Sequence, residues 1–526
     1  MRKLFSPLQR FGKRKSARVA TLTLLVVATA CDPVRNDEAQ IPPAATVTQG
    51  QVPPAGIATR PPDLPTPTVT TEPRAANLPT ATPLSQVAQE PTIHIAPAEP
   101  TVPAVPQQRE QSTMQLLHRQ GKDILDEQGN RVILKGVNFG GACLSSGYEL
   151  GVLLMSETEF YDKVGKAVGD AAAEQFRMDL CNHFIKAEDF RKAAEMGFNS
   201  VRLPFNYRIL EDDEQPFVYK ESGWAALDKL IDAAEKHGIY VILDMHSAPG
   251  GQSAAFVNDP ARQNGKPDKE SLLWGETKEG KETPEANLNK QRTVALWQAI
   301  AGRYADRKNI AGYDLLNEPA TSEGQGKELV DLYQQIISGI RQVDKNHMVF
   351  IEGDKGSWDF SAFTERFRQT GRLLDENMVY APHLYSFFVD TPGDSDNIAE
   401  RGIRSSLMNG MRDMEEEQQV PIWIGEFGEN DYATINADLD AMNNPENSID
   451  GYAFWLWKRP SAIHPNLHYI QRPESWKKLG GFINLPVLKP SEEEARKGLQ
   501  DFLNASDINR VETDQQMVTI FQKYLP

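Results

Sequence analysis

Two glutamates stand out because each lies in a short motif at the end of an apolar run. Glu318 stands between Asn317 and a proline, and Glu426 stands between a glycine and a phenylalanine. Two carboxyl groups about 5 to 5.5 Å apart can cleave a glycosidic bond with retention of configuration, one attacking the anomeric carbon and the other transferring the proton. A positive charge from Arg202 would keep Glu426 ionised while Glu318 holds the proton. The alternative is a pair of glutamates that serve only in salt bridges.

Further polar or aromatic residues follow other apolar runs in the same way. They are Arg202, His246, Asn317, His383, Tyr385 and Trp455. Ionisable groups at such positions are costly to bury without a task or a partner, so we expect them to share one site. The two histidines lack the His-x-His or His-x-x-x-His spacing of metal centres, and the chemistry of paired carboxyls needs no cofactor. We therefore expect neither a metal nor a cofactor.

The elements that must position these groups form an alternating pattern of apolar runs and amphipathic stretches. The runs are 132–138, 199–204, 240–245, 312–317, 348–352, 379–383, 421–426 and 452–457. Eight strands with intervening helices predict an α/β fold, a (β/α)8 TIM barrel, in which functional groups emerge at the carboxyl ends of the strands. A doubly wound open sheet is the alternative, but the glycine-rich turn that often follows its first strand is missing.

The order of these motifs resembles glycoside hydrolase family 5, from about residue 121 to the end. That family consists of retaining enzymes on a (β/α)8 barrel that act on β-linked glucans, mannans and related glycans. The resemblance implies that Glu318 is the acid/base and Glu426 the nucleophile, and that the nucleophile is hydrogen-bonded by Arg202 and Tyr385.

The resemblance also implies sugar contacts. Asn317 matches the residue that binds the 2-hydroxyl, and His246 and His383 match residues that contact the sugar in the reacting subsite. Trp455 matches the tryptophan beneath that sugar. Trp457, two residues further along, is expected to be a core or helix-facing residue.

Two long connections are expected to shape the substrate. One spans 140–182, and the other runs from Ser247 to about Asn289. The start of the second resembles the glucan-exohydrolase branch of the family. Connections this long are usually functional or partly helical, and we expect both to close one end of the cleft and favour short or terminal β-glucosyl units. Cys143 and Cys181 lie in the first connection, where a disulfide and two free thiols are both compatible with the sequence.

The chain is expected to have three parts. Residues 1–31 combine seven basic residues, a short apolar stretch and Cys31, which is the pattern of a bacterial export signal with a lipoprotein cleavage site. Ordinary secretion with an incidental cysteine is the alternative. Residues 32–112 hold 17 of the 35 prolines and predict a disordered linker. Residues 113–526 form the barrel domain.

Composition limits the partners. A net charge of −17 argues against nucleic acid, and 40% hydrophobic residues exclude a polytopic membrane protein. We expect a monomeric β-glycosidase, exported to the cell envelope or beyond, whose partners are a β-linked glucan or oligosaccharide and a lipid anchor. The alternatives are a noncatalytic glycan-binding protein on a degenerate barrel, and an enzyme for mannan or a glycolipid.

Overall fold

The computed structural model describes residues 113–526, apart from 153–154, 256–257, 260–261, 264–265, 268–270, 276–281, 322–325, 386–397, 461–463 and 486–487. The export signal with Cys31 and the proline-rich linker, predicted for residues 1–112, lie outside the described residues. Within the described part of the chain, no helix has the length and the apolar character needed to cross a membrane.

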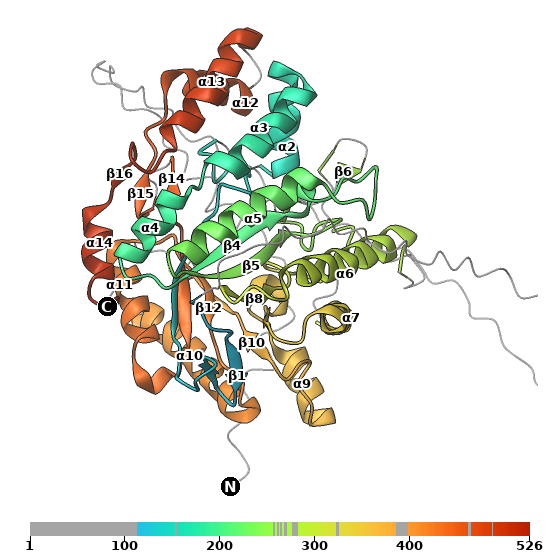
Figure 1. Ribbon diagram of the computed structural model, residues 1–526, viewed down its shortest axis with the longest axis vertical. Coiled ribbons are helices and arrows are strands. Elements are labelled where there is room, and N and C mark those ends of the chain that lie inside the picture. The colour runs from blue at the N-terminus through green and yellow to red at the C-terminus, as the bar shows by residue number, and fades with distance from the viewer. Residues whose placement is uncertain are drawn as a thin grey trace, which may run out of the picture. The chain divides into compact units, whose positions relative to one another are not determined.

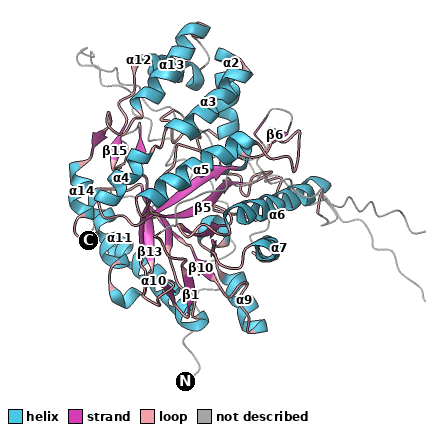
Figure 2. Cartoon of the chain, in the orientation of Figure 1, coloured by secondary structure: helices cyan, strands magenta, loops and turns pink. Residues whose placement is uncertain are grey.

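A ring of parallel strands forms the centre of the domain (Figures 1 and 2). In chain order the strands are β3 (Leu134–Asn138), β4 (Ser200–Asn206), β5 (Tyr240–Ser247), β8 (Ile310–Asp314), β9 (Met348–Ile351), β10 (Met378–Tyr380), β11 (His383–Leu384), β12 (Ile424–Gly428) and β13 (Gly451–Trp455). All neighbouring strands in this ring are parallel. The predicted (β/α)8 barrel is confirmed.

The ring closes through its sixth strand, which is split into two short pieces. β10 pairs with β9, whereas β11 pairs with β12 on the other side. The backbone N–H of Trp423 donates to the carbonyl of Tyr380 at 2.9 Å, so β10 also reaches the start of β12. Because β10 and β11 together occupy one strand position between β9 and β12, the nine strands make an eight-membered barrel.

Apolar side chains fill the barrel interior, and a hairpin covers its amino-terminal end. The interior cluster includes Ile242, Met348, Phe350 and Trp423. The hairpin consists of β1 (His118–Gln120) and β2 (Asp123–Leu125), and its Leu117 and Ile124 side chains belong to the same cluster. This apolar packing fixes the strands and leaves polar groups for the opposite end.

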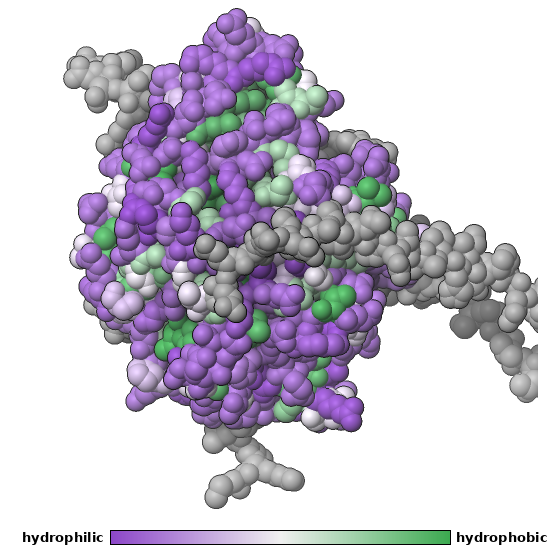
Figure 3. Space-filling view, in the orientation of Figure 1, coloured by the Kyte–Doolittle hydropathy of each residue, from purple (hydrophilic) through white to green (hydrophobic). Residues whose placement is uncertain are grey.

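Helices surround the barrel and take up its outer faces. The main ones are α4 (Ala187–Glu195), α5 (Glu221–Lys236), α6 (Pro284–Tyr304), α7 (Lys327–Val343), α9 (Ser361–Thr370), α10 (Ile398–Gln418), α11 (Tyr432–Met442) and α14 (Gln515–Phe521). α6 begins where Thr283 accepts a hydrogen bond from the N–H of Ala286, and Pro284 occupies its first turn. Hydrophilic residues cover most of the face in Figure 3, as the high net charge predicts.

The connection 140–182 is mostly helical. It contains α2 (Glu157–Val168) and α3 (Asp170–His183), which lie beside α12 (Glu474–Asn484) and α13 (Glu492–Ala505) in Figure 1. Trp476 of α12 stacks on Phe502 of α13 with ring centroids 4.1 Å apart and lies 6.3 Å from the ring of Phe176. The four helices therefore pack on one another beside the barrel, and their apolar side chains belong to the main hydrophobic cluster of the domain.

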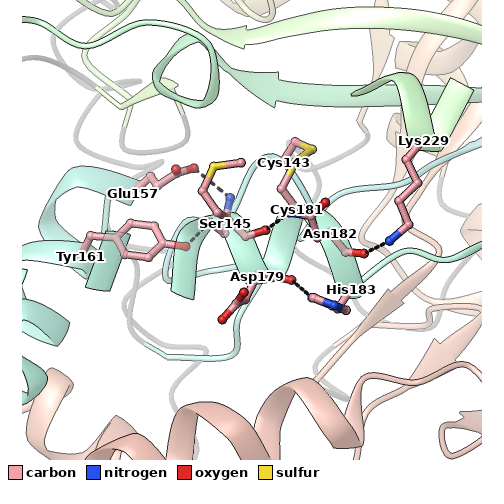
Figure 4. The surroundings of a disulfide bond; sticks show 10 residues. Cys143, Ser145, Glu157, Tyr161, Asp179, Cys181, Asn182, His183 and Lys229 are labelled. Atoms are coloured by element: carbon pink, nitrogen blue, oxygen red, sulfur yellow. Dashed lines mark hydrogen bonds between the residues drawn. A yellow bond between two sulfur atoms is a disulfide. The ribbon is translucent and has the colours of Figure 1, made fainter. Parts of the chain in front are cut away.

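A disulfide ties the two ends of this connection together. Cys143 follows the first barrel strand and bonds to Cys181 of α3, with 4.3 Å between the Cα atoms (Figure 4). Close by, Glu157 accepts from the backbone N–H of Ser145 at 2.8 Å and from Arg177 at 2.7 Å. The segment after β3 is thus fixed to α2 and α3 by a covalent bond and by buried hydrogen bonds.

Candidate active site

The predicted site residues meet at the carboxyl ends of the strands. They come from β4 (Arg202), β5 (His246), the segment after β8 (Asn317 and Glu318), β11 and the residue following it (His383 and Tyr385), β12 (Glu426) and the end of β13 (Trp455). One boundary differs from the prediction, because β8 ends at Asp314 and the polar motif lies in the turn that follows. All eight residues nevertheless belong to one site.

The two glutamates approach each other across this end of the barrel. A carboxylate oxygen of Glu318, one of Glu426 and a ring nitrogen of His383 all lie within 4.8 Å of one another. The side chain of Glu318 is 24% exposed, whereas that of Glu426 is 6% exposed. Glu318 therefore stands at the open side of the pair and Glu426 at the buried side.

The backbone of Glu318 has a conformation that non-glycine residues seldom adopt. Its φ is 44°, in the left-handed region, which costs roughly 1–3 kcal/mol. Two hydrogen bonds hold it there: its N–H donates to Glu352 Oε2 at 2.7 Å, and its carbonyl accepts from Asn258 Nδ2 at 3.2 Å. The turn after β8 is thus fixed from both sides.

Two donors hold Glu426 from beneath. Arg202 Nη1 donates to Oε1 at 2.6 Å, and the Tyr385 hydroxyl donates to Oε2 at 2.8 Å. Burial raises the pKa of Glu426, and the positive charges of His383 and Arg202 oppose that rise. With both oxygens bonded, the carboxylate has a fixed orientation, as an attacking group requires.

Arg202 lies at the centre of a buried set of four carboxylates, which we call the Arg202 network. Its members are Asp244, Asp314, Glu352 and Glu426, at 3.1, 2.8, 2.9 and 2.6 Å from its nitrogens. All three guanidinium nitrogens are bonded, and Arg202 has no exposed surface. Burial, reinforced by Glu352 and Asp244, raises the pKa of Asp314 well above its usual value, against the effect of Arg202. The environment of Asp314 therefore favours its neutral form.

Sequence reasoning missed Asp314 and Glu352. Both are acidic residues in or directly after apolar runs that become β8 and β9. That position is a usable signal, because a charged group pointing into a barrel must find a partner. Asp244, a third member of the network, has its Oδ2 2.7 Å from His246 Nδ1.

His383 links the two glutamates. Its Nδ1 lies 3.0 Å from Glu318 Oε1 and 3.7 Å from Glu426 Oε2, and its Nε2 lies 3.2 Å from Glu352 Oε1. Burial lowers the pKa of His383, but the neighbouring carboxylates Glu352 and Glu426 outweigh burial and raise the pKa well above its usual value. The neighbouring carboxylates therefore favour the cationic form of the imidazole.

His383 acts on the pKa values of both glutamates. Burial raises the pKa of Glu318, yet the hydrogen bond and the charge of His383 prevail and lower it overall. The pKa of Glu426 is raised instead. The expectation that Glu426 is ionised while Glu318 holds the proton considered Arg202 and left out His383, which acts on both carboxyl groups.

Asn317 is held beside Arg202. Its Oδ1 accepts from Arg202 Nη2 at 3.0 Å, and its Nδ2 donates to Asn258 Oδ1 at 3.1 Å. Gln252, in the second long connection, donates to the carbonyls of His246 and Asn317 at 2.8 and 2.7 Å. Sequence reasoning noted the stretch containing Gln252 but not its function, which is to join the ends of β5 and β8.

Trp455 forms one wall of the site and Trp457 does not. The indole of Trp455 stacks on the ring of His246, with centroids 5.4 Å apart and 18° between the planes. It packs with Leu144 and Tyr385. Trp457 is fully buried, and its Nε1 donates to Asp189 of α4 at 2.8 Å. The prediction that Trp457 is a core residue is confirmed.

The acidic groups do not form a free metal site among the described residues. Asp244, Asp314 and Glu352 offer oxygens within 4.8 Å of one another, but Arg202 already bonds to each of them. In the second group the cationic His383 lies between Glu318 and Glu426. Both groups are therefore compensated by side-chain cations.

The family model for cellulase, glycosyl hydrolase family 5, matches residues 161–461. The chain belongs to glycoside hydrolase family 5. It is accordingly an O-glycosyl hydrolase, and the resemblance noted from the strand-end motifs is confirmed. The noncatalytic alternative is set aside by this membership.

Curated relatives of this family 5 hydrolase differ in their substrates. A β-xylosidase from Phanerodontia chrysosporium is 31% identical over 366 residues, which are 66% of this chain and 71% of that protein. Endoglucanase C from Acetivibrio thermocellus is 28% identical over 216 residues, 41% of this chain and 54% of that protein. A probable glucan 1,3-β-glucosidase A from Aspergillus fumigatus is 26% identical over 278 residues, 49% of this chain and 60% of that protein.

Solved structures are similar to this hydrolase over much of its length, at low identity and low TM-score. Thermotoga maritima Cel5A in complex with cellobiose is 17% identical, with a TM-score of 0.43, covering 70% of this chain and 97% of that chain. An endogalactoceramidase is 20% identical, with a TM-score of 0.44, covering 66% of this chain and 75% of that chain.

Proposed function

We propose that this protein cleaves β-glucosidic bonds of glucans or gluco-oligosaccharides by double displacement, with Glu426 as nucleophile and Glu318 as acid/base. The observation that carries the proposal is the short distance between the two carboxylates, whose oxygens lie within 4.8 Å of each other. Inverting enzymes need about 6.5 to 9.5 Å between the carboxyl groups to admit a water molecule, and retaining enzymes need about 5 to 5.5 Å.

In the first step, a Glu426 oxygen forms a bond to the anomeric carbon as the bond from that carbon to the leaving oxygen breaks. Glu318 donates a proton to the departing oxygen. In the second step, Glu318 takes a proton from water, the water oxygen bonds to the anomeric carbon, and Glu426 is released. The more exposed position of Glu318 suits the acid/base, which must reach both the leaving group and water.

His383 has a part in preparing the first step. Its hydrogen bond and charge lower the pKa of Glu318 in the free site, and the first step requires a proton on Glu318 once substrate is bound. A sugar that excludes water makes the charged pair of His383 and Glu318 less favourable than the neutral pair. The 3.0 Å contact between Nδ1 and Oε1 provides a direct route for that transfer.

Azide rescue distinguishes the two roles. We expect Glu426→Ala to lose aryl β-glucosidase activity by about 10⁴-fold or more. Added azide should restore turnover in this variant and give the α-glycosyl azide. With Glu318→Ala, azide should give the β-glycosyl azide. The reverse pattern of products would overturn the assignment, and no hydrolysis of any β-glucoside by the unaltered protein would overturn the substrate class.

We further propose that the connection 140–182 and the connection after β5 close one end of the cleft, so that the enzyme acts on short or terminal glucosyl units. The name of the relative from Aspergillus fumigatus, a glucan 1,3-β-glucosidase, supports such an exo-acting enzyme. Incubation with polymeric β-glucan tests this idea. A rapid loss of viscosity before free sugar accumulates would indicate internal cutting and contradict it.

We also propose that the protein is exported and anchored through a lipid on Cys31, with residues 32–112 as a flexible tether. The support is the basic and apolar segment before Cys31 and the high proline content after it. Cys31→Ser should move the protein from the membrane fraction to the soluble fraction. Continued sedimentation with membranes would reject the anchor.

A further inference from the structure

A second charged group lies beside the active site, on the side of Trp455. It consists of Tyr148 and Glu149 from the connection 140–182, Glu429 after β12 and Arg459 of β14 (Lys458–Arg459). We call it the Glu149 cluster. Arg459 Nη1 donates to Glu429 Oε1 at 2.9 Å, and the hydroxyl of Tyr148 donates to the same oxygen. The guanidinium lies over the Tyr148 ring, 4.9 Å from its centroid.

This cluster adjoins the catalytic groups. A Cβ atom built on Gly140 would lie 3.3 Å from the six-membered ring of Trp455 and 3.8 Å from Cγ of Glu149, so both side chains flank the same point. The negative charge of Glu429 also acts on Tyr385, the tyrosine bonded to Glu426. The cluster is therefore continuous with the wall that Trp455 and Tyr385 form.

Two polar atoms of the cluster have no hydrogen-bond partner among the described residues. They are Glu149 Oε1, an acceptor, and Arg459 Nε, a donor. The other Glu149 oxygen accepts from the hydroxyl of Ser146. Taken over the whole residue, Glu149 and Arg459 are each 1% exposed, and the site residues Trp455 and Glu426 are each 4% exposed. An unsatisfied buried donor or acceptor costs about 1–3 kcal/mol, so an exchangeable partner is expected.

We propose that Glu149 and Arg459 together bind one hydroxyl group of the sugar in the reacting subsite, at the end remote from the bond that is cleaved. A sugar hydroxyl is both donor and acceptor, so it can donate to Glu149 Oε1 and accept from Arg459 Nε. The C4 hydroxyl and the C6 hydroxyl are the candidates, because the anomeric end faces Glu318 and Glu426. This inference rests on the proposed β-glucosidase activity and adds a group that recognises the non-reducing end.

The protonation of Glu149 agrees with this function. Burial raises the pKa of Glu149 to about 7, although the hydroxyl of Ser146 and the charge of Arg459 oppose the rise. Near neutral pH the carboxyl can therefore either accept or donate a hydrogen bond. Glu157, on the same connection and equally buried, has both oxygens bonded within the protein and no such freedom.

Deoxy substrates test the proposal. Values of kcat/KM are measured for an aryl β-glucoside, its 4-deoxy and 6-deoxy analogues, and the β-xyloside, which lacks the C6 hydroxymethyl group. The unaltered enzyme should disfavour one deoxy analogue by about 10- to 100-fold, the value of a hydrogen bond to a charged group. In Glu149→Gln, the ratio of kcat/KM for the glucoside to kcat/KM for the disfavoured deoxy analogue should fall close to one. Its kcat/KM for that deoxy analogue should stay within about twofold of the value for the unaltered enzyme.

Two further variants complete the test. Arg459→Lys keeps the charge but removes the Nε donor, and it should lose the same preference; it carries the test if Glu149→Gln does not fold. Glu157→Gln is the matched control and should retain the preference. An unchanged preference in Glu149→Gln and Arg459→Lys, or an equal loss on all four substrates, would overturn the inference. An unaltered enzyme that cleaves none of the substrates would instead contradict the proposed function.

Discussion

Arg202 and Arg459 are both buried arginines beside the same active site, yet their surroundings differ. Every nitrogen of Arg202 bonds to a protein side chain, and four carboxylates surround it. Arg459 bonds to Glu429, and its Nε is without a partner among the described residues. The guanidinium of Arg202 is fully bonded without substrate and holds the Glu426 carboxylate in place. The guanidinium of Arg459 has a donor left over, as expected of a group that recognises a ligand.

The origins of these groups differ in the same way. Each member of the Arg202 network lies on a barrel strand or directly after one, so the register of the parallel sheet determines its position. The Glu149 cluster combines a connection that follows β3 with segments that follow β12 and β13. Such connections vary more readily than a barrel, which suits a specificity function.

Replacing each arginine in turn should give the largest difference between the two groups. Arg202→Met leaves Asp244, Asp314 and Glu352 without their shared cation, and we expect a loss of about 3–5 kcal/mol in unfolding free energy as well as nearly all activity. Arg459→Met should lower the unfolding free energy by about 1–3 kcal/mol, because it removes the guanidinium that bonds to a single, partly exposed carboxylate, that of Glu429. Urea denaturation measures both. Equal losses of unfolding free energy would show that the two arginines contribute equally to stability, against this expectation.

The disulfide provides the next largest effect. Replacing Cys143 and Cys181 by serine opens a loop whose ends are 38 residues apart, which should cost about 4 kcal/mol of unfolding free energy. Because Cys143 precedes Leu144 and the Glu149 cluster, KM for an aryl β-glucoside should rise, while the barrel keeps its catalytic geometry. A decrease in kcat with KM unchanged would show that the disulfide supports the catalytic geometry of the barrel, and it would contradict this prediction.

Glu149 should also make stability depend on pH. Its pKa of about 7 in the folded protein exceeds the value of about 4.3 for an unfolded chain. The folded state therefore binds the extra proton, and this stabilisation is fully present below about pH 4.3 and is lost as the pH rises through 7. Ser146, Arg459 and Glu429 act on the pKa of this carboxyl, and together they do not reverse the sign.

The measurement is the difference in unfolding free energy between Glu149→Gln and the unaltered protein, from pH 5 to pH 8. The variant should gain up to about 3 kcal/mol relative to the unaltered protein over this range. A difference that does not vary with pH would mean that Glu149 has an ordinary pKa.

The smallest expected effect concerns a single hydrogen bond in the Arg202 network. Tyr385→Phe removes the hydroxyl that donates to Glu426 Oε2 at 2.8 Å. We expect kcat to fall by about 10- to 100-fold with little change in stability, since Arg202 still holds the other oxygen. If Tyr385→Phe leaves kcat unchanged, Arg202 alone suffices to orient the nucleophile.

The sequence was sufficient for the barrel and for the groups at its strand ends. Apolar runs of strand length separated by amphipathic helices predict the eight strands, and a charged or aromatic residue at the end of a run is a local signal, as with Arg202 and Glu426. Once the barrel fold was predicted, the residues that it brings together at the strand ends could therefore be predicted as well.

Other features depend on contacts between distant segments and carry no such signal. Nothing in the sequence around Glu149 or Arg459 predicts that the two lie together, because the folding of the connection 140–182 onto the segment after β13 decides it. The effect of His383 on the two glutamates escaped prediction for a related reason. It depends on His383 Nδ1 lying 3.0 Å from Glu318 Oε1 and 3.7 Å from Glu426 Oε2, distances that no sequence pattern encodes.

The left-handed backbone at Glu318 has a consequence for the evolution of this enzyme. A glycine adopts a φ of 44° without steric strain, so Glu318→Gly would make the turn after β8 easier to form while abolishing proton transfer. The side chain that we propose as the acid/base thus stands at a position where the backbone alone would favour glycine.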